Sequence, residues 1–146
     1  MSEEKKLIVL LVEDEPADAH LVRLAFVEGR LLAELYHTQD GVEAFAFLRG
    51  EGEYAEMPTP DLILLDLNMP RMDGRQFLRK IKEDSRLQII PVIILTTSDA
   101  EIDLVASYAD GAAGYIVKPV DVDSFIKTVQ GIGDYWISVV RLPSRL

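Results

Sequence analysis

Acidic, hydroxyl and basic side chains directly follow the short apolar runs of this sequence. They are Glu13 and Asp14 after residues 7–12, Asp66 after residues 62–65, Thr96 and Thr97 after residues 92–95, and Lys118 after residues 112–117. If the runs are parallel strands of one sheet, their carboxyl ends share one edge and these side chains meet there. Three carboxylates in one place repel one another and raise at least one pKa, and a divalent cation removes that repulsion.

The ligand atoms in this arrangement are hard oxygens, and no His or Cys lies beside them in the sequence. This donor set favours Mg²⁺ or Mn²⁺ over Zn²⁺. A carboxylate site that keeps open water positions can share its cation with a phosphoryl group. Lys118 would then supply a point positive charge to the phosphoryl oxygens, and the Thr96 hydroxyl would donate a hydrogen bond to one of them.

Each of these features also has an ordinary structural explanation when it is taken alone. An Asp at a strand end is commonly a turn residue or a helix cap, and the acids at 13–15 could simply favour the start of a helix. A Lys-Pro step is usually a loop, and a pair of Thr residues could end a β-branched strand. The joint placement of these residues after four apolar runs favours the functional interpretation.

The elements that must position these residues alternate between apolar runs and helical patterns. Strands are expected at residues 7–12, 31–37, 62–65, 92–95 and 112–117. Helices are expected from Pro16, from an Asp40 and Glu43 capping box, from Gly74, from a Ser98 and Glu101 capping box to Tyr108, and from Val122. Continuous apolar strands are buried on both faces, and their alternation with helices implies a parallel sheet with right-handed crossovers. The sequence therefore predicts a three-layer α/β domain of five βα units.

Length and composition limit the classes of protein that fit. The 146 residues suit one domain, and an apolar fraction of 49% is enough for a core. A net charge of −10, from 15 basic and 25 acidic residues, argues against binding to nucleic acid or to an anionic membrane. The absence of Cys excludes a disulfide scaffold and a thiol nucleophile. The first apolar run is too short for a signal peptide or a membrane span, so we expect a cytoplasmic protein.

The same residues stand in motifs that resemble the receiver domain of bacterial two-component response regulators. The motifs are V-E-D-E at 12–15, L-L-D-L-N-M-P at 64–70, M-D-G at 72–74, I-L-T-T-S at 94–98 and Y-I-V-K-P at 115–119. The resemblance runs from about Leu7 to Gln130. It implies a flavodoxin-like, doubly wound sheet with strand order 2-1-3-4-5, in a single domain with its core at about 7–130 and a helical tail at 131–146.

The resemblance implies a role for each residue that matches a family motif. Asp66 matches the phospho-acceptor, and Lys118 matches the lysine that contacts the phosphate. The implied Mg²⁺ site consists of the side chains of Asp14 and Asp66, the backbone carbonyl of Asn68, and Glu13 as a second acid that usually reaches the metal through water. The implied switch residues are Thr96 and Tyr115, and Pro119 matches a proline that follows a cis peptide bond. Glu13 is a mild departure, because many members have Asp there.

By this resemblance the protein accepts a phosphoryl group from a phosphohistidine of a sensor histidine kinase and is not an enzyme with an external substrate. Asp66 attacks in line, while a cation and Lys118 neutralise charge on the moving group. Thr96 then moves toward the phosphoryl oxygens and Tyr115 turns inward, which switches the face made by the fourth helix, the fifth strand and the fifth helix. Attack by water reverses the change, and Asn68 and Ser98 are expected to tune its lifetime.

The end of the sequence suggests how the signal is passed on. Sixteen residues follow Gln130 (146 − 130 = 16), too few for an effector domain, so we expect a stand-alone receiver that acts by contact with a downstream protein. The apolar residues of the tail are Trp136, Ile137, Val139, Val140 and Leu142. The first two could complete the last helix against the core, or all five could form an exposed patch. We expect a homodimer that uses this tail and the switching face.

Residues 50–60, expected to form a solvated loop, and the end of the chain resemble the small receivers that are paired with phytochrome histidine kinases. Three other functions fit less well. An aspartyl-phosphate hydrolase commonly has a second Asp two residues after its nucleophile, where this sequence has Asn68. A flavodoxin-like cofactor carrier would not place acids at 13–15, where they repel phosphate. A binding module that has lost phosphorylation would not need the full set of acids with Thr96 and Lys118. His20 and His37 are expected to be structural.

Overall fold

The computed structural model describes residues 6–67, 72–96, 111–118 and 121–138. Five parallel strands form one sheet in the order β2-β1-β3-β4-β5, as the resemblance implies. The strands are β1 Leu7–Val12, β2 Ala33–Thr38, β3 Leu62–Asp66, β4 Val92–Thr96 and β5 Gly114–Val117. The helices are α1 Pro16–Glu28, α2 Gly41–Arg49, the 3₁₀ helix η1 Gly52–Tyr54, α3 Gly74–Glu83 and α5 Val122–Ser138.

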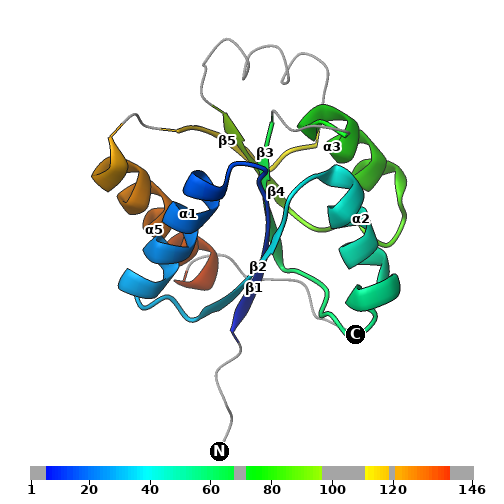
Figure 1. Ribbon diagram of the computed structural model, residues 1–146, viewed down its shortest axis with the longest axis horizontal. Coiled ribbons are helices and arrows are strands. Elements are labelled where there is room, and N and C mark those ends of the chain that lie inside the picture. The colour runs from blue at the N-terminus through cyan, green and yellow to red at the C-terminus, as the bar shows by residue number, and fades with distance from the viewer. Residues whose placement is uncertain (1–5, 68–71, 97–110, 119–120, 139–146) are drawn as a thin grey trace, which may run out of the picture.

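Helices cover both faces of the sheet (Figure 1). α1 and α5 lie together on one face, and α2 and α3 lie on the other. The side chains of β1 alternate between the two layers: Leu10 and Val12 belong to the core cluster under α2 and α3, whereas Val9 and Leu11 belong to the cluster under α1 and α5. A strand that alternates between two dry faces must be apolar throughout, which explains its continuous apolar run. The predicted three-layer α/β architecture is confirmed.

Helix α2 begins as the sequence predicts, but its capping box is only half formed. The Glu43 amide donates to Asp40 Oδ1 at 2.9 Å, so Asp40 is the N-cap. In a reciprocal box the Glu43 carboxylate would accept from the Asp40 amide. It accepts instead from the Gln39 amide at 3.4 Å and from the Tyr54 hydroxyl at 2.8 Å. The predicted box is therefore wrong in this half, because Tyr54 takes the Glu43 side chain.

The segment 50–60 is mostly exposed, as the sequence analysis expects, but it is not wholly irregular. It contains η1, and the Tyr54 ring lies 5.5 Å from the Phe47 ring between centroids. Tyr54 also packs against the core cluster under α2 and α3. Burial and the hydrogen bond to Glu43 raise the pKa of the Tyr54 hydroxyl above its ordinary value. The Gly50 and Glu51 amides also donate to the Phe47 and Ala46 carbonyls, so both backbone and aromatic contacts attach this segment to α2.

Two strands begin later than predicted. β2 begins at Ala33 rather than at 31, because the Leu31 amide donates to the Phe26 carbonyl and closes the turn after α1. β5 begins at Gly114 rather than at 112, after a turn in which Gly111 has a left-handed backbone with φ of 95°. The helix predicted from Ser98 to Tyr108 lies outside the described residues. Among the helices that are described, none combines the length and the apolar character needed to cross a membrane.

Candidate functional site

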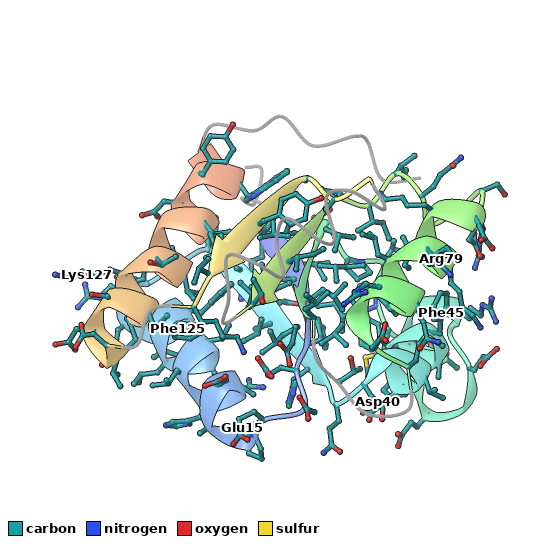
Figure 2. All side chains as sticks on the ribbon, turned by 90° about the horizontal axis from the view of Figure 1, so that it is seen from above. Glu15, Asp40, Phe45, Arg79, Phe125 and Lys127 are labelled. Carbon is teal, nitrogen blue, oxygen red and sulfur yellow. The ribbon has the colours of Figure 1, made fainter. Side chains whose placement is uncertain are left out.

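The carboxyl ends of the central strands bring the predicted site residues to one edge of the sheet. In the parallel register Val12 of β1 pairs with Leu65 of β3. Glu13, which follows β1, and Asp66, the last residue of β3, therefore lie at the same level of the sheet. Asp66 pairs with Leu95 of β4. Figure 2 views the molecule from this edge, with Glu15 and Asp40 marking the starts of α1 and α2 beside it. The convergence predicted from the sequence therefore follows from the strand register.

Three carboxylates form a cluster at this edge. One oxygen from each of Glu13, Asp14 and Asp66 lies within 4.8 Å of the other two. Glu13 and Asp66 are buried, whereas Asp14 is exposed. All the donor atoms are carboxylate oxygens, and such oxygens suit a hard divalent cation such as Mg²⁺ or Mn²⁺. The three residues therefore fit the cation that the sequence analysis predicts.

The Lys118 ammonium faces this cluster from the end of β5. Its Nζ lies 2.7 Å from Glu13 Oε1, 2.8 Å from Asp18 Oδ2 and 3.7 Å from Asp66 Oδ1. Burial alone lowers the pKa of Lys118, but the hydrogen bonds to Asp18 and Glu13 and the charges of Glu13 and Asp66 outweigh it and raise the pKa above its ordinary value. These contacts favour the protonated, positively charged form of Lys118 beside the acids.

Asp18 is a contact of Lys118 that the sequence analysis missed. It lies in the first turn of α1, and the resemblance assigns it no role. A signal for it was present in the sequence. A helix that starts directly after β1 places its first turn at the same edge of the sheet as the strand ends. An acid in that turn is therefore a candidate neighbour of the site.

Glu13 is held in place through both its side chain and its backbone. Its Oε2 accepts from the Glu15 amide at 3.3 Å, and its amide donates to the Thr38 carbonyl at 3.0 Å. The Nε2–H of His37 donates to the Glu13 carbonyl at 2.7 Å. The Glu13 side chain is one methylene longer than that of Asp, and its carboxylate accepts a hydrogen bond from Lys118 Nζ while its backbone is held in place. His37, expected to be structural, supports the backbone of a site residue.

Thr96 and Tyr115 lie on neighbouring strands. Thr96 is fully buried at the end of β4, and the Lys118 amide donates to the Thr96 carbonyl at 2.6 Å. This backbone bond ties the chain at Lys118 to the end of β4. Tyr115, which pairs with Ile94, is partly buried against the core cluster under α2 and α3. The structure thus places both predicted switch residues on adjacent strands.

Helix α3 starts against the chain that follows Asp66. Asp73 and Gln76 form a reciprocal capping box, which the sequence analysis did not expect. The Gly74 amide donates to the Leu67 carbonyl at 2.9 Å. A Cβ at Gly74 would lie 2.8 Å from the Asp66 carbonyl oxygen and 2.8 Å from the Leu67 Cα, both of them backbone atoms. Glycine is required here for close approach, and the contact fixes the backbone at Asp66.

Several predicted residues cannot be placed in this site. The residues Asn68, Ser98, Pro119 with its predicted cis peptide, Val139, Val140 and Leu142 lie outside the described part of the chain. Ile137 falls within α5, and its side chain is not described. Trp136 is partly buried in α5 and packs against the core cluster under α1 and α5.

Comparisons with known proteins agree with this geometry. The family model for the response regulator receiver domain matches residues 9–130. Response regulator Rcp1 of Synechocystis sp. is 44% identical over 137 residues, which are 94% of this chain and 93% of that protein. The crystal structure of the phosphorylated cyanobacterial phytochrome response regulator RcpA is 44% identical with a TM-score of 0.86, and the match covers 95% of this chain and 99% of that one. The crystal structure of the Mn²⁺-bound form of Rcp1 is 43% identical with a TM-score of 0.84, and that match covers 94% of this chain and 99% of that one.

The family match includes every strand end that carries a described site residue, from Glu13 to Lys118. Receiver domains bind Mg²⁺ or Mn²⁺, and the cluster of three acids fits such an ion. The sheet order, the acidic edge and the sequence match agree with one another. This chain belongs to the family of response regulator receiver domains.

Proposed function

We propose that this protein receives a phosphoryl group on Asp66 from a phosphohistidine of a sensor histidine kinase. The observation that carries the proposal is the position of the Asp66 carboxylate, within 4.8 Å of oxygens of Glu13 and Asp14 and 3.7 Å from Lys118 Nζ. A buried carboxylate in contact with a fixed ammonium and two further acids is suited to phosphoryl transfer, where positioning and electrostatics supply most of the catalysis.

In the proposed reaction an oxygen of Asp66 attacks the phosphorus in line. The P–O bond forms as the P–N bond to the kinase histidine breaks, and the electron pair returns to the imidazole. Lys118 offsets charge on the phosphoryl oxygens, and Thr96 donates a hydrogen bond to one of them. Glu13, Asp14 and Asp66, with the Asn68 carbonyl that the resemblance implies, would hold a divalent cation, which would supply further positive charge beside the transferred group. Water later hydrolyses the acyl phosphate, and the protein acts on no other substrate.

Phosphorylation is proposed to act through Thr96 and Tyr115. The buried Thr96 hydroxyl moves toward the phosphoryl group, and Tyr115 fills the space that it leaves. The partial burial of Tyr115 supports this role, because an inward movement would bury more of its ring. The face formed around β5 and α5 thereby gains a second packing that a downstream protein can distinguish.

The similarity to RcpA, which is named a phytochrome response regulator, supports a phytochrome as the partner kinase. Such a partner would place this protein in the cytoplasm, in a pathway that responds to light. The test is phosphotransfer from a purified phytochrome histidine kinase, with an unrelated histidine kinase as control. We expect transfer within seconds from the phytochrome and transfer slower by about a hundredfold from the control. Equal rates would contradict the pairing.

A homodimer through the tail is proposed as the assembled form, with Trp136, Ile137, Val139, Val140 and Leu142 in the contact. Support comes from α5, on which Tyr135 is 52% exposed and Val122 is 50% exposed, and from β5, which lies at one edge of the sheet. Sedimentation velocity measures the assembly directly. Wild type should sediment as a dimer and Val140→Asp as a monomer, and an unchanged dimer in this variant would exclude the tail.

The phosphoryl transfer itself is tested by intact mass after incubation with acetyl phosphate and Mg²⁺. Wild type should gain one phosphoryl group of about 80 Da. The gain should disappear in Asp66→Asn and in wild type treated with a chelator. Small phosphodonors do not serve every receiver, so phosphotransfer from a histidine kinase is measured in parallel. Absence of the adduct with both donors would contradict the proposed function.

A further inference from the structure

Asp18 connects helix α1 to the lysine of the site. Its Oδ2 accepts a hydrogen bond from Lys118 Nζ at 2.8 Å. The Lys118 side chain is only 8% exposed, whereas that of Asp18 is 32% exposed. The partly exposed Asp18 carboxylate thus holds the buried Lys118 ammonium, which lies 100 residues further along the chain. None of the roles described above uses this contact.

The Lys118 ammonium has two hydrogen-bonded carboxylates and one carboxylate at longer range. A lysine ammonium has three N–H donors. Two of them go to Glu13 at 2.7 Å and to Asp18 at 2.8 Å. Asp66 Oδ1, at 3.7 Å, is too distant for a good hydrogen bond but close enough for a strong charge interaction. Glu13 and Asp18 therefore determine where the ammonium stands relative to Asp66.

These two carboxylates differ in their relation to the cation site. Glu13 belongs to the cluster of three acids whose oxygens lie within 4.8 Å of one another, and Asp18 is outside that cluster. A cation in the cluster would share the charge of Glu13 and weaken its hold on Lys118. The contact of Asp18 with the ammonium does not compete in this way. Asp18 is consequently the carboxylate that remains available to Lys118 when the site is loaded.

We propose that Asp18 is a positioning residue, which holds the Lys118 ammonium on the α1 side of the site so that it faces a phosphoryl group arriving at Asp66 and does not pair fully with the acids that would hold the cation. The inference rests on the proposed function, since it assigns Asp18 to the same phosphoryl transfer. Lysine has a flexible four-carbon stem, and fixing its end in advance removes a cost from the transition state.

Asp18 could instead serve only the helix, as an acid in the first turn of α1 that interacts favourably with the helix dipole. That role predicts a change in stability and no specific change at Lys118. Glu15 offers a matched control. It is an exposed acid at the N-cap of the same helix, adjacent to Asp14, and the hydrogen bond that its side chain accepts comes from the Ala17 amide. Glu15→Gln removes the same charge from the same end of α1 without touching Lys118.

The first experiment measures the rate of phosphorylation by acetyl phosphate at saturating Mg²⁺. Asp18→Asn should lower the maximal rate about fivefold, the size expected for one partly exposed charge-assisted hydrogen bond. Asp18→Glu, which keeps the carboxylate, should recover most of the rate, and Glu15→Gln should stay within about twofold of wild type. Urea unfolding of each variant checks that the fold is retained. Equal rates for Asp18→Asn and Glu15→Gln would overturn the proposal.

The second experiment measures the affinity for Mg²⁺ by calorimetry, without any phosphodonor. Loss of Asp18 should let the ammonium pair fully with Glu13 and Asp66 and compete with the cation. Asp18→Asn should therefore weaken Mg²⁺ binding about threefold more than Glu15→Gln does. In a Lys118→Gln background the two substitutions should have equal effects. A difference that persists without the lysine would contradict the proposed route through Lys118.

These readouts separate this inference from the proposed function. If wild type takes no phosphoryl group on Asp66 from any donor, the proposed function fails, and with it the role of Asp18 in transfer. If wild type is phosphorylated normally and the Asp18 and Glu15 variants behave alike in both experiments, the function stands and the positioning role of Asp18 is wrong.

Discussion

The Lys118 ammonium interacts with carboxylates from three different elements of the fold. Glu13 follows β1, Asp18 belongs to α1, and Asp66 ends β3. Each contact spans a large separation along the chain, so the position of this one atom depends on the whole sheet. At the residue scale the Lys118 ammonium offsets part of the repulsion among these carboxylates, and a divalent cation would offset the rest.

Thr96 is predicted to couple phosphorylation to Tyr115. Thr96→Ala should still be phosphorylated on Asp66, because the phosphoryl group is bonded to Asp66 and not to the Thr96 hydroxyl. This variant should lose most of the movement of Tyr115. Thr96→Ser keeps the hydroxyl and should respond as wild type does. The measurement is the ¹⁹F NMR shift of fluorotyrosine at position 115 before and after addition of beryllofluoride and Mg²⁺. A normal shift in Thr96→Ala would refute the coupling.

Gly74 is predicted to be intolerant of any side chain. In Gly74→Ala the new Cβ would meet backbone atoms of Asp66 and Leu67 that cannot rotate away, so the end of β3 or the start of α3 must shift. Such overpacking costs about 1–3 kcal/mol in the free energy of unfolding, and Mg²⁺ affinity should fall with it. Gly131→Ala is the control, since nothing lies within 4 Å of its added Cβ in α5 and alanine favours a helix. Urea unfolding checks both, and equal stability of the two variants would show that the added Cβ at position 74 causes no clash.

At the scale of elements, the site depends on how each helix begins beside the acidic edge. α1, α2 and α3 all start next to the strand ends, with Glu15, Asp40 and Asp73 as their N-caps. These caps satisfy helix amides that would otherwise lack partners.

Asp40 is predicted to stabilise α2 as its N-cap. Asp40→Ala leaves the Glu43 amide without the 2.9 Å hydrogen bond and should lower the free energy of unfolding by about 1–2 kcal/mol. Asp40→Ser supplies another oxygen in the same position and should retain most of the free energy of unfolding that Asp40→Ala loses. Chemical denaturation measures both variants. A loss in Asp40→Ser as large as that in Asp40→Ala would show that the cap is not the source of the stability.

The order of the elements could be predicted from the sequence, whereas some of their contacts could not. Continuous apolar runs and helix starts predict five parallel strands, and the strand ends predict which acids meet. The role of Tyr54 in taking the Glu43 side chain is not encoded in local spacing, because it depends on how residues 50–60 fold back onto α2. Asp18 was missed for a similar reason. Its partner is 100 residues away, and only the closed sheet brings them together.

At the scale of the whole molecule, stability is predicted to depend on the divalent cation. Binding to the folded state alone stabilises it, by about 2.7 kcal/mol at a hundredfold excess over the dissociation constant. Thermal melts should shift upward with Mg²⁺ and return with a chelator. Asp14→Asn removes one of three mutually repelling acids. It should therefore melt at or above wild type without Mg²⁺ and below wild type with it. The same ranking of the two proteins in both conditions would argue against a cation at this cluster.

Asp66 is proposed to be the residue that carries the phosphoryl group. The most direct test is to trap the acyl phosphate with borohydride, which reduces a phosphorylated aspartate to homoserine, and to sequence the peptides by mass spectrometry. Homoserine is expected at position 66 after incubation with a phosphodonor and Mg²⁺, and none is expected there in protein kept with a chelator. Phosphorylated protein with homoserine at Asp14 or another acid, and with Asp66 unmodified, would show that Asp66 is not the phospho-acceptor.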